Sequence, residues 1–250
     1  MITIEKNKIY YIFDVDGTLT EPRQKMSKKF ASFFDKWSDN KKIILSSGSD
    51  YEKIKEQIPA NILQKCELIF SCMSNEIRDA AGEILASNTF EVSSKLRSDL
   101  LGFVTKSEFP LKTGNHLELR TGMLNFSTVG RNATLNERKQ YEDWDIVNKE
   151  RQFIANYVNK NYPKMEASVG GSISIDIINK GADKGQTINF LIQYGLERCV
   201  FVGDRAFPGG NDYGIIRELI KSNIEYRYYN VLGPKDTVKL ITINRDFKQE

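Results

Sequence analysis

The chain has little of the side-chain chemistry on which many enzymes and secreted proteins depend. Its 250 residues include one histidine, His116, and three cysteines, Cys66, Cys72 and Cys199. With one histidine in an alternating segment, "HLELR", catalytic triads and histidine-rich zinc sites are effectively excluded. The odd number of cysteines, without C-x-x-C spacing, does not fit a disulfide framework. We therefore expect ordinary reduced thiols.

The sequence also lacks long apolar runs and any concentration of charge. No apolar run approaches the ~18 residues of a membrane span, and the N-terminal segment lacks the basic-then-apolar pattern of a secretory signal. We therefore expect a cytoplasmic protein with no membrane partner. The net charge is +3, and the 36 basic residues are dispersed among 33 acidic ones. This distribution gives no support for a nucleic-acid partner.

Short apolar runs alternate with helical patterns at both ends of the chain. The runs at 9–13, 42–47 and 199–204 have strand composition, and each ends in a polar, loop-like segment. Segments 27–40 and 187–196 repeat apolar residues at helical spacing. Strands alternating with helices of this length predict an α/β domain with a mostly parallel sheet.

The middle of the chain has a different pattern. Segments 116–130 and 167–179 alternate apolar and polar residues, as antiparallel strands with one wet face do. Segment 136–162 between them predicts one long amphipathic helix or two. The sequence therefore predicts an α+β insert over 81–178, within a core domain formed by 1–80 and 179–250.

Acids and hydroxyls follow the three predicted core strands. Asp14 and Asp16 come after the first strand, 47–50 (Ser-Gly-Ser-Asp) after the second, and Asp204 after the third. In open parallel sheets such residues face a common crevice, and their oxygen atoms suit Mg²⁺. A D-x-D-G run also begins a calcium loop, but Lys25 stands where that loop needs its closing glutamate. In isolation, the run would more often cap a helix.

Four motifs in order carry a family resemblance: "DVDGTLT", "SSGSD", "KGADKG" and "GDRAFPGGNDY". The chain resembles the haloacid dehalogenase-like phosphotransferases and, among them, the eukaryotic-type phosphomannomutases, from about residue 9 to 237. "RTGMLNFSTVGRNATLNER" and "SVGGSISID" extend this resemblance into the insert. It implies a Rossmann-like parallel-sheet core, haloacid dehalogenase-like, with the inserted α+β region as a substrate-binding cap domain.

The resemblance implies roles for the acids. Asp14 would attack phosphorus and carry an aspartyl-phosphate, which splits one displacement into two. Asp16 would transfer protons to and from the sugar oxygen, while its backbone carbonyl helps to hold Mg²⁺. Asp204 would complete the metal's protein ligands, supported by Asn211 and Asp212.

Other core positions match the family less uniquely. Lys184 matches the lysine that offsets charge on the phosphate and the nucleophile, although Lys180 and Lys184 could each be a solvent-facing lysine near a helix start. Ser49 matches the residue that binds the transferring phosphate, but with Ser47 beside it the sequence leaves open which serine does so. Arg23 matches an arginine at the substrate entrance.

The insert contains residues that match the family's substrate-binding set. Guanidinium groups bind phosphate oxygens in pairs, and three arginines match those that clamp the distal phosphate: Arg120, Arg131 and Arg138. Ser174 and Asp176, two residues apart on one strand face, match residues that bind sugar hydroxyls. Taken singly, each arginine would more often be a surface charge.

The leading functional hypothesis is a phosphomannomutase that interconverts mannose 6-phosphate and mannose 1-phosphate, activated by a hexose 1,6-bisphosphate. The alternative is a Mg²⁺-dependent sugar phosphatase with the same Asp14 intermediate and water as acceptor. A sugar-phosphate sensor without activity is a third hypothesis, against which the complete set of motif acids argues. The resemblance also implies a homodimer formed through the cap.

Overall fold

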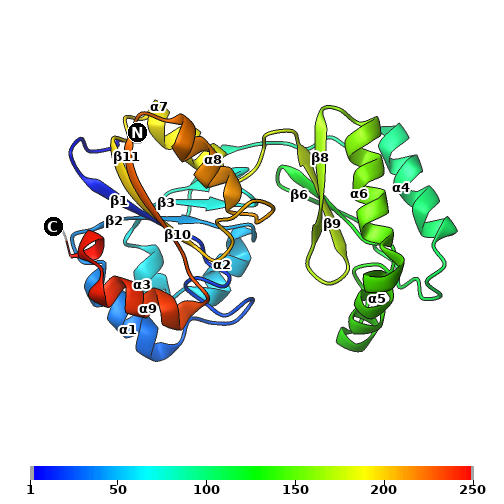
Figure 1. The fold of residues 1–250 in the computed structure, drawn as a ribbon, viewed down its shortest axis with the longest axis horizontal. Coiled ribbons are helices and arrows are strands. Elements are labelled where there is room, and N and C mark those ends of the chain that lie inside the picture. The colour runs from blue at the N-terminus through cyan, green and yellow to red at the C-terminus, as the bar shows by residue number, and fades with distance from the viewer. Residues whose placement is uncertain (1–2, 249–250) are drawn as a thin grey trace. The chain divides into compact units, whose positions relative to one another are not determined.

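The computed structural model describes residues 3–248 and shows two compact units (Figure 1). The first, the core unit, combines Met1–Ser87 with Ala182–Glu250, and the second, the cap unit, is Asn88–Gly181. The predicted insert, 81–178, and the cap unit share residues 88–178. Within the described residues, none of the helices combines the length and apolar character needed to cross a bilayer.

The core unit is built on a mostly parallel sheet. The strand order is β11-β10-β1-β2-β3-β4-β5, in which the first five strands are parallel and β4 and β5 are antiparallel additions. The strands are β1 (Ile9–Phe13), β2 (Lys42–Ser46), β3 (Cys66–Ser71), β4 (Glu76–Arg78), β5 (Ile84–Ser87), β10 (Arg198–Gly203) and β11 (Glu225–Asn230). The strands predicted at 9–13, 42–47 and 199–204 are confirmed to within a residue at each end.

Helices cover both faces of this sheet (Figure 1). α7 and α8 lie on one face, and α1, α2, α3 and α9 pack on the other. Their bounds are α1 (Lys28–Trp37), α2 (Tyr51–Gln57), α3 (Ala60–Leu63), α7 (Gln186–Gln193), α8 (Tyr213–Lys221) and α9 (Pro234–Ile243), followed by the 3₁₀ helix Arg245–Phe247.

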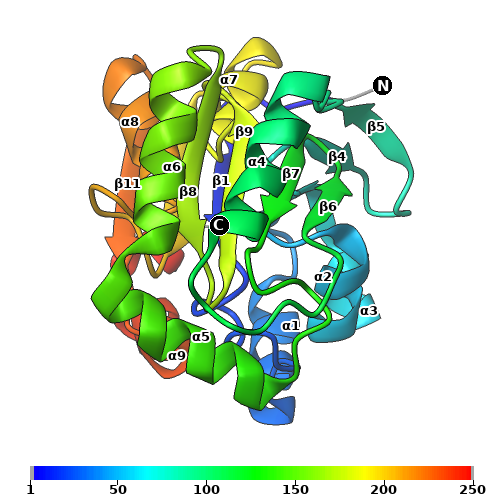
Figure 2. The same ribbon diagram turned by 90° about the vertical axis from the view of Figure 1, so that its right-hand side faces the viewer.

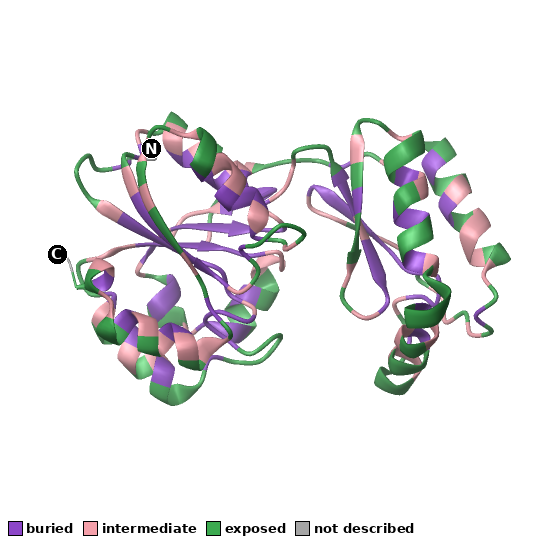
Figure 3. Ribbon diagram, viewed as in Figure 1, coloured by how far each residue is buried: buried purple, intermediate pink, exposed green. Residues whose placement is uncertain are grey.

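The central strand β1 shows why the sheet is double-sided. Tyr11 and Phe13 point into the apolar cluster beneath α1 and α9, while Tyr10 and Ile12 point into the cluster beneath α7 and α8. A strand buried on both faces reads as an unbroken apolar run, as "IYYIF" does. In Figure 3 the strands in the middle of the core sheet are purple, the colour of buried residues.

The cap unit is a four-stranded antiparallel sheet, within the described residues, of order β6-β7-β9-β8. Figure 2 shows helices α4 and α6 in front of it. The elements are α4 (Ser94–Lys106), β6 (Leu117–Arg120), β7 (Met123–Phe126), α5 (Leu135–Asn148), α6 (Glu150–Asn161), β8 (Met165–Gly170) and β9 (Ser174–Asn179). Segment 136–162, predicted as one long helix or two, forms two helices, α5 and α6. They are separated at Lys149, whose φ is 56°.

The two faces of the cap sheet differ in chemistry. Leu124, Phe126, Ile175 and Ile177 belong to the apolar cluster formed with α4 and α6. The alternate positions in these strands, which include Asn125 and Asp176, point to the opposite face, because successive side chains in a strand alternate. This second face carries Ser174 and Asp176, which the sequence analysis singled out.

Candidate active site

Asp14 lies at the carboxyl end of β1, in the interior of the core unit. Its backbone N–H donates to the carbonyl of Val202 at 2.9 Å, which extends the pairing of β1 with β10 by one residue. Its side chain is 2% exposed, and one of its oxygens accepts a hydrogen bond from the Thr18 hydroxyl at 3.2 Å. Asp14 does not cap a helix, because α1 begins only at Lys28, after the N-cap Ser27.

Lys184 joins Asp14 to a second buried acid, Asp212. Its ammonium nitrogen lies 2.5 Å from Asp14 Oδ1 and 2.6 Å from Asp212 Oδ1. Both Lys184 and Asp212 are 0% exposed, whereas Lys180 is exposed. Of the two lysines left open by the sequence, Lys184 is therefore the one beside the predicted nucleophile.

The buried group around Lys184 contains more acids than bases. Burial raises the pKa of Asp14 above its usual value, and repulsion by Asp212 and Asp204 adds to the rise, against the attraction of Lys184. Burial would lower the pKa of Lys184, but Asp14 and Asp212 outweigh it and hold that pKa above its usual value. The site therefore has an excess of negative charge that a cation would offset.

Three carboxylates form a group that could hold a metal ion. Ligand oxygens of Asp14, Asp204 and Asp212 lie within 4.8 Å of one another. Two glycines allow this approach: a Cβ on Gly17, where φ is 83°, would lie 2.4 Å from an Asp204 oxygen, and a Cβ on Gly203 would lie 2.4 Å from an Asp212 oxygen. Oxygen donors at this spacing fit a hard divalent cation such as Mg²⁺.

The Asp16 side chain turns to other partners. Asp16 Oδ1 accepts from the backbone N–H of Arg23 at 2.7 Å and from Gln57 Nε2 at 2.8 Å, and Oδ2 accepts from the Ser49 hydroxyl at 3.0 Å. Asp16 is half-buried, and its carboxylate lies outside the group of three. Hydrogen bonds from Arg23, Ser49 and Gln57 thus hold the Asp16 carboxylate in place.

The two serines after β2 have different surroundings. Ser47 is buried, and its hydroxyl accepts from the backbone N–H of Ser49 at 3.0 Å. The Ser49 hydroxyl instead donates to Asp16. Ser49 is therefore the serine whose side chain is next to a predicted catalytic acid, whereas Ser47 shapes the turn.

Asp183 fixes the loop that carries Lys184. One of its carboxylate oxygens accepts from the backbone N–H of Gly185 at 2.8 Å, and the carboxylate pairs with Arg217 at 2.9 Å and 3.2 Å. A Cβ on Gly214 would lie 2.5 Å from Asp183 Oδ1, so a glycine is needed there. These contacts hold the loop that carries Lys184 against α8, just before α7 begins at Gln186.

In the cap unit, two of the predicted arginines share one carboxylate. Arg120 Nη2 and Arg131 Nε donate to the same Glu118 oxygen, Oε2, at 2.9 Å and 2.8 Å. Arg131 Nη1 also donates to the hydroxyl of Ser174 at 2.8 Å. The structure thus brings Arg120, Arg131 and Ser174 together on the cap sheet.

The remaining predicted substrate residues have separate contacts. Arg138 donates to the backbone carbonyls of Ala133 and Arg131 at 2.8 Å and 2.7 Å, so it binds the loop that carries Arg131. Asp176 accepts from Asn125 Nδ2 at 2.5 Å across β9 and β7. In the core unit, Arg23 is exposed and has a left-handed backbone, with φ 60°.

A profile of the eukaryotic phosphomannomutase family matches residues 30–245 of the chain. The chain belongs to this family. Its relatives include the phosphomannomutase of Saccharomyces cerevisiae, 34% identical over 95% of this chain and 94% of that protein. Phosphomannomutase 1 of Homo sapiens is 31% identical over 94% of this chain and 91% of that protein. Membership of the phosphomannomutase family confirms the predicted resemblance and makes the chain an enzyme of the isomerase class.

Solved structures confirm the predicted fold class. A haloacid dehalogenase-like hydrolase from Bacteroides thetaiotaomicron superposes with a TM-score of 0.57 at 13% identity, over 94% of this chain and 99% of that chain. An IMP-nucleotidase from Plasmodium falciparum gives a TM-score of 0.58 at 15% identity, over 95% of this chain and 68% of that one. At these identities the likeness concerns the fold alone.

Sequence reasoning for this phosphomannomutase family member missed three residues beside its predicted site. Asp183 was inside a quoted motif, "KGADKG", and the glycines around it could have indicated a close approach. Glu118 lies two residues before Arg120, and their opposite charges on one strand face were a signal. No sequence signal indicated Gln57, because it belongs to helix α2 and comes close to Asp16 only in the folded protein.

Proposed function

We propose that the protein interconverts mannose 6-phosphate and mannose 1-phosphate through an aspartyl-phosphate on Asp14 and a hexose 1,6-bisphosphate. The observation that carries this proposal is the buried group in which Lys184 joins Asp14 to Asp212, with Asp204 beside it. An anionic nucleophile next to a fixed cation suits phosphoryl transfer, in which catalysis is largely positioning and charge stabilisation. Family membership supports the same substrates.

In each half-reaction Asp14 exchanges the phosphoryl group and Asp16 exchanges the proton. The 1-hydroxyl oxygen of mannose 6-phosphate attacks the phosphorus on phosphorylated Asp14, Asp16 takes the hydroxyl proton, and the bond from phosphorus to Asp14 breaks. The resulting bisphosphate reorients. Asp14 then attacks the phosphorus of the 6-phosphate, and Asp16 returns its proton to the leaving O6, which yields mannose 1-phosphate. A hexose 1,6-bisphosphate activator supplies the first phosphorylation.

Mg²⁺ fits the carboxylate group of the core unit. Asp14, Asp204 and Asp212 would hold it, together with the backbone carbonyl of Asp16, and the ion would neutralise charge on the phosphate oxygens. The Asp212 carboxylate is an addition to the predicted ligands, since the resemblance implied only a supporting role for this residue. Lys184 stays protonated between its two acids and keeps Asp14 oriented.

The cap unit would bind the phosphate that does not react. Arg120 and Arg131 are half-buried and both donate to Glu118, and Arg138 holds the Arg131 loop. Ser174 and Asp176 would bind sugar hydroxyls, Arg23 would meet the substrate from the core, and Ser49 would bind the transferring phosphate. A cytoplasmic location remains part of this proposal.

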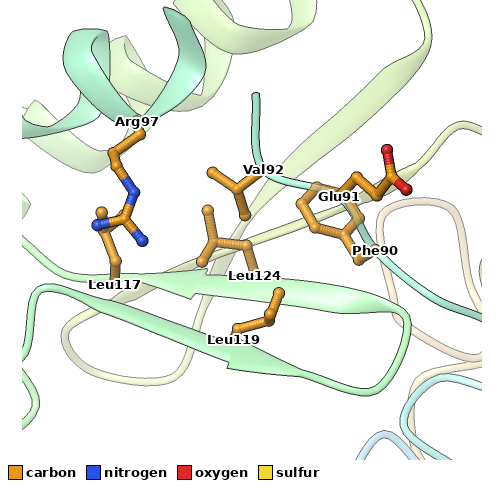
Figure 4. Close-up of a pocket in the computed structure, with 7 residues that line it drawn as sticks. All are labelled: Phe90, Glu91, Val92, Arg97, Leu117, Leu119 and Leu124. Atoms are coloured by element: carbon orange, nitrogen blue, oxygen red, sulfur yellow. The ribbon is translucent and has the colours of Figure 1, made fainter. Parts of the chain in front are cut away.

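We also propose that two copies associate through the cap unit. β6 is an edge strand of the cap sheet, and its Leu119 is 61% exposed. Leu119 lines a pocket of about 460 Å³ together with Phe90, Glu91, Val92, Arg97, Leu117 and Leu124. Figure 4 shows these side chains. An exposed edge strand with an apolar side chain is a surface that a second copy would cover.

The experiment that tests the activity is a product balance. The protein is incubated with mannose 1-phosphate, Mg²⁺ and a trace of glucose 1,6-bisphosphate, and mannose 6-phosphate, free mannose and inorganic phosphate are measured. We expect mannose 6-phosphate as the main product, and no product with Asp14→Asn, because an amide is a poor nucleophile. Free mannose and phosphate as the main products would show a phosphatase instead.

A further inference from the structure

Glu118 lies between the two arginines of the cap sheet and contacts both. Its Oε2 atom accepts from Arg120 Nη2 at 2.9 Å and from Arg131 Nε at 2.8 Å. Glu118 and Arg120 are two residues apart on β6 and therefore lie on one face, while Arg131 comes from the loop after β7. One acid thus reduces the charge of this group from two positive units to one.

The fold itself gives little reason for this acid. The Glu118 side chain is 35% exposed and lies outside the apolar cluster beneath α4 and α6. Partly exposed ion pairs of this kind contribute little to stability. Burial would raise the pKa of Glu118, but hydrogen bonds and attraction from Arg120 and Arg131 outweigh it and lower that pKa. At neutral pH Glu118 is therefore an anion, and it lies at the place where a phosphate would bind.

We propose that Glu118 is a positioning residue that weakens the cap's hold on the non-reacting phosphate, so that the bisphosphate can leave the arginines between half-reactions. This inference rests on the proposed mutase function. A phosphate at Arg120 and Arg131 meets the repulsion of Glu118 and competes with it for the same N–H groups. Each guanidinium has five N–H donors, so binding is weakened rather than blocked.

The reason lies in the reaction sequence. A mutase must grip the distal phosphate in one half-reaction and release it before the next. Binding that is equally strong in the ground state and the transition state does not raise kcat, and slow release lowers it. Two arginines with no neighbouring anion would hold a phosphate dianion too long.

This role and a purely structural role predict opposite signs. If Glu118 only oriented Arg120 and Arg131, its loss would free both side chains and weaken phosphate binding. If it opposes the phosphate, its loss strengthens binding. The variant Glu118→Gln keeps the size of the side chain and an accepting oxygen, so it removes the charge with little change in packing.

The test is a calorimetric titration with glucose 1,6-bisphosphate and Mg²⁺ at fixed ionic strength. Asp14→Asn serves as the parent, so that the ligand is not consumed. We expect Glu118→Gln to lower the Kd roughly tenfold, which is the short-range Coulomb effect discounted for solvent exposure. Asp143→Asn is the matched control, since this exposed acid pairs with Lys139 on α5, and we expect its Kd to equal that of the parent.

Turnover gives a second measurement. With Asp14 intact, Glu118→Gln should lower both KM for mannose 1-phosphate and kcat, because release becomes slower. Glu118→Ala should also lower the Kd for the bisphosphate. It replaces the glutamine variant if that variant folds poorly. An unchanged or higher Kd in a variant with the parent's melting temperature would overturn the inference and leave the mutase standing. A parent that binds no bisphosphate would overturn both.

Discussion

Replacement of Lys184 by methionine tests the buried charge group most directly. Methionine keeps a long apolar stem in place but removes the ammonium that lies 2.5 Å from Asp14 and 2.6 Å from Asp212. Both acids then remain buried and face each other without a cation. We expect a large loss of stability in metal-free buffer, together with a loss of turnover.

The magnitude follows from the burial of all three groups. Lys184 and Asp212 are 0% exposed and Asp14 is 2% exposed. Removal of one member of a buried ion pair costs about 3–5 kcal/mol. For a chain of this size each kcal/mol corresponds to about 2–4 °C, so the melting temperature should fall by roughly 6–20 °C. A domain has only about 5–15 kcal/mol in total, so this is a substantial share.

The assay should report on the core unit alone. The two tryptophans are Trp37 in α1 and Trp144 in α5. In a Trp144→Phe background, fluorescence follows Trp37, which packs against the apolar cluster of the core. Lys180→Met is the matched control, because Lys180 is exposed on the same loop and should change stability by less than about 0.5 kcal/mol.

The pH dependence has a definite sign. Burial raises the pKa of Asp14, and Lys184 opposes that rise. Without Lys184 the pKa of Asp14 is higher still. The loss of stability in the variant is therefore largest at pH values above that pKa. The deficit shrinks as the pH falls and Asp14 takes up a proton. A Lys184→Met variant as stable as Lys180→Met, or a deficit that grows on acidification, would refute the buried charge group.

Four further predictions concern Asp16, Arg131, Gly17 and Leu119. Asp16→Asn should fold normally and lose ~10²–10⁴-fold in kcat, measured by mannose 6-phosphate formation; normal turnover would remove Asp16 from proton transfer. Arg131→Ala should cost roughly ten- to a hundredfold in kcat/KM on mannose 1-phosphate but spare a small aryl phosphate; equal losses in a well-folded variant would place Arg131 outside the distal-phosphate site. Gly17→Ala should destabilise the core, because φ is 83° and the new Cβ would lie 2.4 Å from Asp204, whereas Gly102→Ala in α4 has open space and should stabilise by about 0.5–1 kcal/mol in urea unfolding. Leu119→Glu should shift the protein from dimer to monomer in light scattering; a wild-type monomer at micromolar concentration would contradict the proposed dimer.

The sequence determined the core strands and the chemistry at their ends. Strands such as β1 and β10 are unbroken apolar runs because both faces of the sheet are covered, and that pattern is local. The acids after them are fixed by position, since residues that follow parallel strands share one edge of the sheet. The helix α4 was not predicted from its sequence, and the hydroxyl of Ser49 could not be separated from that of Ser47.

The tertiary structure decided which of these groups meet. Lys184 is 170 residues from Asp14 and adjacent to it, while Lys180, four residues earlier, is exposed. Local sequence could not separate them, because each lies near a helix start and each is a lysine. The same holds for Glu118, whose contact with Arg131 depends on how the loop after β7 returns to β6. Periodicity determines secondary structure over a few residues, whereas the distance between two charges depends on the order of strands in the sheet and on the packing that closes around them.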